Sequence, residues 1–199
     1  MPNRKPTIKK VIFIGNYPPR RCGIATFTFD LCENFAQKNP KIHCEAIAVN
    51  DINAGYEYPD RVHFEIKEQK IESYQKAADY INESETDIIC LQHEYGIFGG
   101  QDGSHLLTLL NQVKPPIVTT FHTVKKEPTT RQRKILSEIT NLSEFVVVMT
   151  QKAADLLQTV YSITPQKIII IPHGIPKMNF IDPNFYKDQF SVEGKTVLS

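Results

Sequence analysis

Short apolar runs rich in β-branched residues alternate with segments of helical period along almost the whole chain. Residues 8–14 form the first run, and residues 23–36 follow it with a period close to 3.6. The apolar side chains that share one face of this segment are Ile24, Phe27, Leu31 and Phe35. The pattern predicts a buried strand followed by a helix that packs on it through this face.

The same alternation continues to the last apolar run. Further strands are expected at residues 43–49, 62–66, 87–91, 117–120, 145–149 and 167–171. Helices are expected at residues 71–83, 104–113, 129–142 and 151–161, and Thr150 is placed to cap the last of these. Strands joined by helices require right-handed crossovers between parallel strands. We therefore predict an α/β fold with a doubly wound, mostly parallel, Rossmann-like sheet and helices on both faces.

Short polar loops follow the apolar runs, and they hold most of the distinctive chemistry of the chain. In a parallel sheet these loops meet at the carboxyl edge, where ligands bind. The residues that this edge would collect are Arg20, Arg21, Gly23, His93, Glu94, His122 and His173. Glycines, bases and imidazoles together favour a ligand that carries phosphate or many hydroxyl groups.

The loop after the first strand offers a phosphate site. Gly23 lacks a Cβ, so a phosphate could approach the backbone N–H groups at the positive end of the following helix. A tight turn that requires glycine explains the residue equally well. Arg20 and Arg21 could hold a phosphate through paired hydrogen bonds, although adjacent loop arginines are more commonly solvated.

Two further strands end in imidazoles. His93, Glu94 and Tyr95 run from one strand into a glycine-rich loop, and we expect them to contact the ligand. The alternative is that His93 bonds a backbone carbonyl and Glu94 pairs with a lysine. His122 follows the next strand, where it could exchange a hydrogen bond with a sugar hydroxyl. Zinc ligation by His93, Glu94 and His122 is conceivable, but no His-x-x-x-His pair is present and we expect no metal.

Composition narrows the class of protein. The chain has 199 residues, a formal net charge of +1 and a pI near 7.7, so it fits one α/β domain and has no overall field that would attract nucleic acid. The four cysteines show no Cys-x-x-Cys pair, which favours reduced thiols and a cytoplasmic location. The apolar run at residues 11–15 is too short for a signal peptide or a membrane span.

A basic stretch and the C-terminal tail qualify this picture. The basic residues are Lys125, Lys126, Arg131, Arg133 and Lys134. They could make peripheral contact with anionic lipid headgroups or with a diphosphate, although a solvated helix face is the more usual explanation. The proline-rich tail leaves the sheet, and residues 194–199 resemble the start of another strand. We therefore expect a Rossmann-like domain at residues 1–190 and the start of a truncated second domain at residues 191–199.

Three segments carry a resemblance to a known family. They are Asn16-Tyr17-Pro18-Pro19 through Gly23-Ile24-Ala25-Thr26, then Thr120-Phe121-His122-Thr123, then Ile171-Pro172-His173-Gly174-Ile175. Together they resemble the amino-terminal domain of group 1, GT-B glycosyltransferases. The resemblance implies two Rossmann-like domains that face each other across a cleft, with the acceptor on the amino-terminal domain and the nucleotide sugar on the carboxy-terminal one. It also implies retention at the anomeric carbon without a metal ion.

The resemblance assigns roles to individual residues. Gly23 would lie near the donor diphosphate, together with Arg20 or Arg21, and His122 would contact the donor sugar as the catalytic residue. Independently of the resemblance, the position of His93, Glu94 and Tyr95 at the end of a strand predicts that they meet the acceptor or the sugar. The chain departs from the family pattern at Cys22, where a further glycine is common. In the family's Pro-Asn-Gly-Val-Asp-like linker, His173 replaces Asn and Pro176 replaces Asp.

The expected function is transfer of a hexosyl group from a nucleotide-sugar donor to an acceptor hydroxyl, with retention and no cofactor. Because the donor-binding residues would lie in a second, C-terminal domain, we expect this chain alone to be inactive. Two alternatives remain open at this stage. One is an autonomous α/β module that binds a sugar or a nucleotide without chemistry, and the other is an enzyme similar to nucleotide-sugar epimerases.

Overall fold

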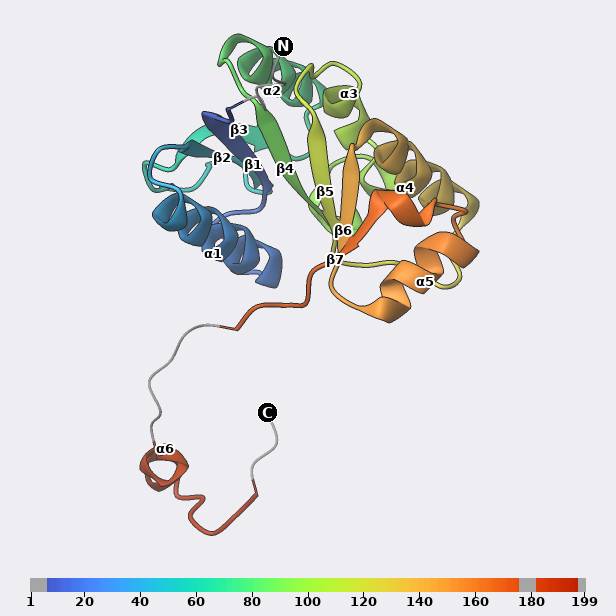
Figure 1. Ribbon diagram of the computed structural model, residues 1–199. Helices are drawn as coiled ribbons and strands as arrows, with labels where there is room; N and C mark the ends of the chain where they lie inside the picture. Colours follow the sequence, from blue (N-terminus) through green and yellow to red (C-terminus); the bar gives the residue numbers. More distant parts are fainter. Residues whose placement is uncertain (1–6, 176–181, 197–199) are drawn as a thin grey trace.

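Seven strands pair in parallel in one sheet within residues 7–175 and 182–196, the part of the chain that the computed structural model describes (Figure 1). Their order is β3-β2-β1-β4-β5-β6-β7. The strands are β1 (Lys10–Gly15), β2 (His43–Asn50), β3 (Val62–Lys67), β4 (Ile88–His93), β5 (Ile117–Phe121), β6 (Phe145–Val148) and β7 (Ile168–Ile170). This order confirms the predicted doubly wound α/β fold.

Helices cover both faces of the sheet, but unequally. The described helices are α1 (Gly23–Lys38), α2 (Ile71–Glu83), α3 (Leu106–Leu110), α4 (Thr130–Leu142), α5 (Gln151–Thr159) and α6 (Pro183–Gln189). Ile12 and Ile14 of β1 belong to the larger core, which also holds side chains of α2, α3, α4 and α5. Val11 and Phe13 belong to a smaller core with Cys32 of α1. Figure 1 shows α1 set apart from the group of α2 to α5.

Helix α1 packs only in part through the face that its apolar residues predict, because Ile24 and Phe35 pack against the two cores whereas other residues are fully buried. Its fully buried residues are Ala25, Thr28 and Cys32, whereas Leu31 remains 36% exposed. The reason is a close approach between the helix and the sheet, because a Cβ added to Gly15 would lie 2.8 Å from Thr28 Oγ1. Only small side chains fit between the helix and the sheet at this distance.

Most of the other predicted helices and strands are confirmed. The differences are in the helix predicted at residues 104–113 and in the C-terminal tail. Thr150 caps α5 as expected, because its Oγ1 accepts a hydrogen bond from Ala153 N at 3.1 Å. The helix predicted at residues 104–113 is shorter and spans Leu106–Leu110, and Asp102 and Gly103 before it adopt left-handed φ values of 56° and 80°. Helix α6 was not predicted from the tail. The described part of residues 194–199 forms no strand, and residues 197–199 lie outside the described range.

The sheet order places a crevice at the carboxyl ends of two neighbouring strands. Strand β1 pairs with β2 on one side and with β4 on the other, so the chain crosses over in opposite directions from this point. Loops that follow β1 and β4 therefore diverge to opposite faces and leave a crevice between them. The predicted site residues after β1, β4 and β5 all lie at this carboxyl edge.

The loop after β4 is tied to the loop after β3 through Gly99. Gly99 N donates a hydrogen bond to Tyr74 Oη at 2.8 Å, and that hydroxyl donates to the Glu68 carbonyl oxygen at 2.9 Å. A Cβ added to Gly99 would lie 1.7 Å from the same carbonyl oxygen. The loops can approach this closely only with a glycine at position 99.

We expect Gly99→Ala to lower the free energy of unfolding by about 1–3 kcal/mol or more, since the new methyl group must push the two loops apart. Gly96→Ala is the matched control in the same loop, because a Cβ there meets no atom within 4 Å. The control should change stability by no more than about 0.5 kcal/mol. Urea denaturation of both variants measures the difference, and equal stabilities would contradict this close approach.

Candidate functional site

An imidazole, an amide and an aromatic ring meet at the carboxyl edge of the sheet. The Nε2 atom of His122 lies 3.0 Å from Gln92 Oε1. The ring of Phe27, one turn into α1, stands edge-on to His122 with centroids 4.7 Å apart. The ring of His173 also contacts Phe27, with ring centroids 5.2 Å apart. We call this group the carboxyl-edge site. Its residues are Gly23, which begins α1, and Phe27, Gln92, His122 and His173.

Strand alternation explains which side chains meet there. Successive side chains of a strand point to opposite faces, so His93 shares the larger core's face with Leu91, and Gln92 points the other way. In β5, Phe121 likewise belongs to the larger core, and the next residue, His122, lies beside Phe27 of α1. The site therefore forms on the face that α1 covers.

His122 is neutral in this setting. A carbonyl oxygen can only accept, so the contact with Gln92 Oε1 puts the imidazole proton on Nε2 and leaves Nδ1 as an acceptor. Burial, followed by the nearby His173, lowers the pKa of His122 from 6.5 to about 4. The side chain can therefore accept a proton or a hydrogen bond near neutral pH without carrying a positive charge.

Gly23 occupies a position at which the fold itself does not require glycine. Its φ lies outside the left-handed region, and an added Cβ would meet no atom within 4 Å. Cys22 caps the helix, with its Sγ accepting a hydrogen bond from Ala25 N at 3.3 Å. The tight-turn explanation for Gly23 thus finds no support, and the positive end of a 16-residue helix lies beside an exposed glycine.

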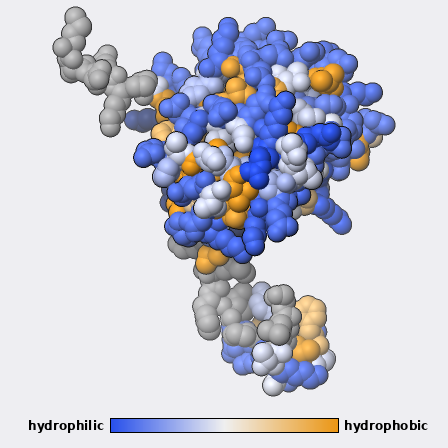
Figure 2. Space-filling view, turned by 90° about the vertical axis from the view of Figure 1, so that its right-hand side faces the viewer, coloured by the Kyte–Doolittle hydropathy of each residue, from blue (hydrophilic) through white to orange (hydrophobic). Residues whose placement is uncertain are grey.

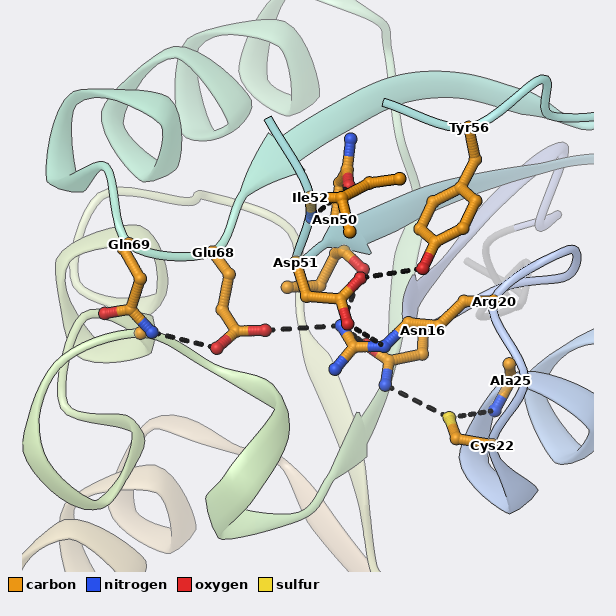
Figure 3. Close-up of polar contacts among 12 residues, drawn as sticks. Asn16, Arg20, Cys22, Ala25, Asn50, Asp51, Ile52, Tyr56, Glu68 and Gln69 are labelled. Atoms are coloured by element: carbon orange, nitrogen blue, oxygen red, sulfur yellow. Dashed lines mark hydrogen bonds and ion pairs between the residues drawn. The ribbon is translucent and has the colours of Figure 1, made fainter. Parts of the chain in front are cut away.

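Arg20 is held by protein groups rather than pointing free toward a ligand (Figure 3). Its Nη1 atom donates to Asn16 Oδ1 at 3.1 Å, to the Val49 carbonyl at 3.2 Å and to Glu68 Oε2 at 3.3 Å. Its Nε atom lies 3.4 Å from Asp51 Oδ2. The side chain is only 13% exposed and connects the loops after β1, β2 and β3. A phosphate could bind this guanidinium only by displacing those partners, whereas the neighbouring Arg21 is exposed.

The structure buries two of the three residues for which contact with the acceptor is predicted. His93 is fully buried among the rings of Tyr95, Phe98 and Phe121, at centroid distances of 5.1, 6.1 and 5.3 Å. Neither ring nitrogen has a hydrogen-bond partner among the described residues, and burial lowers its pKa to about 3. Tyr95 is 7% exposed. A direct contact from His93 or Tyr95 stays a prediction, and it requires movement of this loop.

Glu94 is the accessible member of that group. It is partly buried, and its carboxylate accepts hydrogen bonds from Tyr95 N at 2.9 Å and from the Thr123 hydroxyl. It does not pair with a lysine among the described contacts. These bonds connect the loops after β4 and β5 and keep the carboxylate near His122.

Sequence reasoning missed Gln92 and Phe27. The alternation of side chains along β4 was the available signal, because it puts Gln92 and His93 on opposite faces. Phe27 and Gln92 both line a cavity of about 190 Å³, whose largely apolar lining also includes Thr120. A larger cavity of about 770 Å³, lined in part by His43 and Arg61, lies at the opposite end of the sheet and contains none of the site residues.

The basic stretch near α4 is partly engaged by the protein itself. Lys125 Nζ lies 5.3 Å from the centroid of the Tyr95 ring, and Arg131 lies 3.9 Å from Asp102. Arg133 donates to the carbonyl of Val160. Figure 2 shows that the side of the molecule nearest α4 and α5 is largely hydrophilic. Among the described helices, none has the length and apolar character needed to cross a bilayer.

Comparison with known proteins identifies relatives of this chain. The sequence profile described as Glycosyltransferase Family 4 matches residues 22–177. A glycosyltransferase from Rickettsia africae ESF-5 has a similar crystal structure, with a TM-score of 0.65 and 16% identity. The match covers 94% of this chain and 50% of that one, so this chain spans half the length of that relative.

Weaker structural matches include an α-glucosyltransferase in complex with UDP and a 13-mer DNA containing an HMU base. It has a TM-score of 0.45 and 11% identity, and the match covers 70% of this chain and 37% of that one. The TM-score is too low to support an argument about this chain. No curated protein matches the sequence significantly.

Two histidines, the fully buried His93 and the partly buried His122, make stability depend on pH. Their pKa values in the folded chain, about 3 for His93 and about 4 for His122, lie below the ordinary 6.5. Between these folded-state values and pH 6.5, the unfolded chain therefore binds more protons than the folded chain. The folded state has its full stability above pH 6.5, and this stability is lost as the pH falls toward 4.

We expect His93→Phe to reduce the slope of the unfolding free energy against pH by up to about 1.4 kcal/mol per pH unit. Urea denaturation at several pH values tests this, and an unchanged slope would show that His93 is not a buried neutral imidazole.

Proposed function

Because the chain belongs to Glycosyltransferase Family 4, we propose that it is the acceptor-side half of a GT-B enzyme. In this proposal the enzyme transfers a hexosyl group from a nucleotide sugar to an acceptor hydroxyl, with retention at the anomeric carbon. The single observation that carries this proposal is the carboxyl-edge site. There an uncovered glycine at the positive end of α1 lies on the same edge as a neutral imidazole.

The N-terminus of α1 suits the leaving group of this reaction. A nucleoside diphosphate departs with negative charge, and backbone N–H groups at a helix N-terminus stabilise such charge. Gly23 presents no side chain that would hold phosphate oxygens away from these groups. The exposed guanidinium of Arg21 adds a positive charge next to Gly23, while Arg20 stays with its partners and positions the loop.

His122 suits the sugar at the reacting centre. Transfer passes through a sugar with oxocarbenium character, which an imidazolium ion would repel. A neutral His122 with its proton on Nε2 keeps Nδ1 as an acceptor for a sugar hydroxyl, and Gln92 holds the ring in that tautomer. Such a hydrogen bond aligns the donor without adding unfavourable charge.

The acceptor side of the proposal rests on the loop after β4. Glu94 is the accessible carboxylate there, and it is positioned by Thr123, next to His122. Carboxylates bind sugar hydroxyl groups through charge-assisted hydrogen bonds. His93 and Tyr95 support this loop from below in the present conformation.

The donor-binding residues belong, in this proposal, to a second domain that faces the carboxyl edge. This chain spans 50% of the length of the Rickettsia glycosyltransferase, which leaves room for such a domain in an enzyme of that size. The nucleotide sugar is a substrate, and the proposal includes no resident metal or organic cofactor. The isolated chain would then lack the groups that hold the nucleotide and would show no turnover.

A Gly23→Ala substitution in the two-domain enzyme tests this proposal. We expect the efficiency kcat/KM for the nucleotide sugar to fall at least about tenfold, because the new methyl group occupies the approach of the diphosphate. Thermal unfolding should be unchanged or slightly raised, since alanine fits this backbone without a clash.

Gly96→Ala is the matched control, because its Cβ also meets no protein atom within 4 Å. It should retain the efficiency of the unsubstituted enzyme toward the donor. Equal efficiencies for the Gly23 variant and the control would remove the N-terminus of α1 from donor binding. Absence of sugar transfer by the unsubstituted two-domain protein toward every nucleotide sugar tried would contradict the proposed function as a whole.

A further inference from the structure

A second cluster of polar side chains lies at the amino edge of the sheet, at the other end of the strands from the carboxyl-edge site. Its centre is Glu45 of β2, which is only 3% exposed. His43 Nε2 lies 2.7 Å from Glu45 Oε1, and His63 Nδ1 lies 3.7 Å from the same oxygen. One ligand atom from each of these three residues lies within 4.8 Å of the other two.

A break in strand pairing brings His63 to this cluster. Ala46 of β2 pairs with Val62, and the next residue, Ile47, pairs with Phe64. His63 is therefore left over as a bulge residue on the edge strand β3. Bulges redirect a side chain that regular pairing would point elsewhere, and they recur beside functional sites. Here the bulge turns the ring of His63 toward Glu45.

We propose that His43, Glu45 and His63 bind a divalent transition-metal ion of the zinc type, with a water molecule in the fourth position. Two imidazole nitrogens and one carboxylate oxygen are a donor set that zinc accepts and that magnesium and calcium do not favour. Zinc with ligands at about 2.0–2.2 Å holds neighbouring ligand atoms about 3.4 Å apart. The distances of 2.7 and 3.7 Å to Glu45 Oε1 bracket that spacing.

The surroundings of Glu45 allow the ion to enter and hold the carboxylate in place. The side chains of His43 and His63 are 58% and 41% exposed, so small rotations can bring both nitrogens onto the ion. Tyr80 donates a hydrogen bond to Glu45 Oε2 at 2.7 Å, which fixes the carboxylate and leaves Oε1 for the metal.

Lys10 competes with a metal ion for Glu45 Oε1. Its ammonium group lies 2.7 Å from Glu45 Oε1 and thus neutralises the buried carboxylate when no metal is bound. A divalent ion would replace this charge, and Lys10 would have to swing away. The ion would also connect the edge strand β3 to β2, so binding should stabilise the folded chain.

Titration of zinc into the metal-free 199-residue chain, followed by calorimetry and by thermal unfolding, tests the proposal. We expect one zinc ion per chain and a higher Tm in its presence, with no comparable effect of magnesium or calcium. His63→Ala and His43→Ala should each weaken zinc binding at least about tenfold while the metal-free fold is kept, since both side chains are largely exposed. Lys10→Met should tighten binding, because it removes the competing positive charge.

Cobalt(II) substitution identifies the ligands, because the chain also contains cysteines. The proposed site predicts the visible absorption of four-coordinate cobalt without a thiolate-to-metal charge-transfer band. His173→Gln is the control, and it should bind the ion as the unsubstituted chain does. A thiolate band, an unchanged affinity in both histidine variants, or the absence of saturable binding would each overturn the proposal.

Discussion

The architecture of the site depends on one constraint, the two-residue alternation of side chains along the parallel strands β4 and β5. It sends His93 and Phe121 into the larger core and leaves Gln92 and His122 for the face that α1 covers. A shift by one residue in either strand would exchange these sets. It would then bury His122 and expose His93. The packing of the core thus decides which imidazole is available for chemistry.

The surroundings of the site follow from this arrangement. Burial keeps His122 neutral, and the start of α1 lies at the same edge with an uncovered glycine. Arg20 connects the three loops that follow β1, β2 and β3, so the approach to this glycine has a fixed shape. The proposed binding of a sugar diphosphate depends on this combination of a neutral imidazole and a helix N-terminus at one edge.

Much of the fold was predictable because β-branched runs and helical periods are local signals. The sequence also predicted correctly that segments containing Gly23 and His122 would reach the same edge, because parallel strands impose it. The partners of Arg20 could not be predicted, since Asp51 and Glu68 approach it only in three dimensions. The bulge at His63 was equally hidden, because it depends on the pairing of β3 with β2.

Histidine side-chain NMR over a pH titration distinguishes the core imidazole from the imidazole of the site. We expect His122 to carry its proton on Nε2 and to titrate with a pKa of about 4, and His93 to titrate with a pKa near 3. Titration of both rings near the ordinary value of 6.5 would mean that neither is buried as described. The division of β4 and β5 into a core face and a site face would then be wrong.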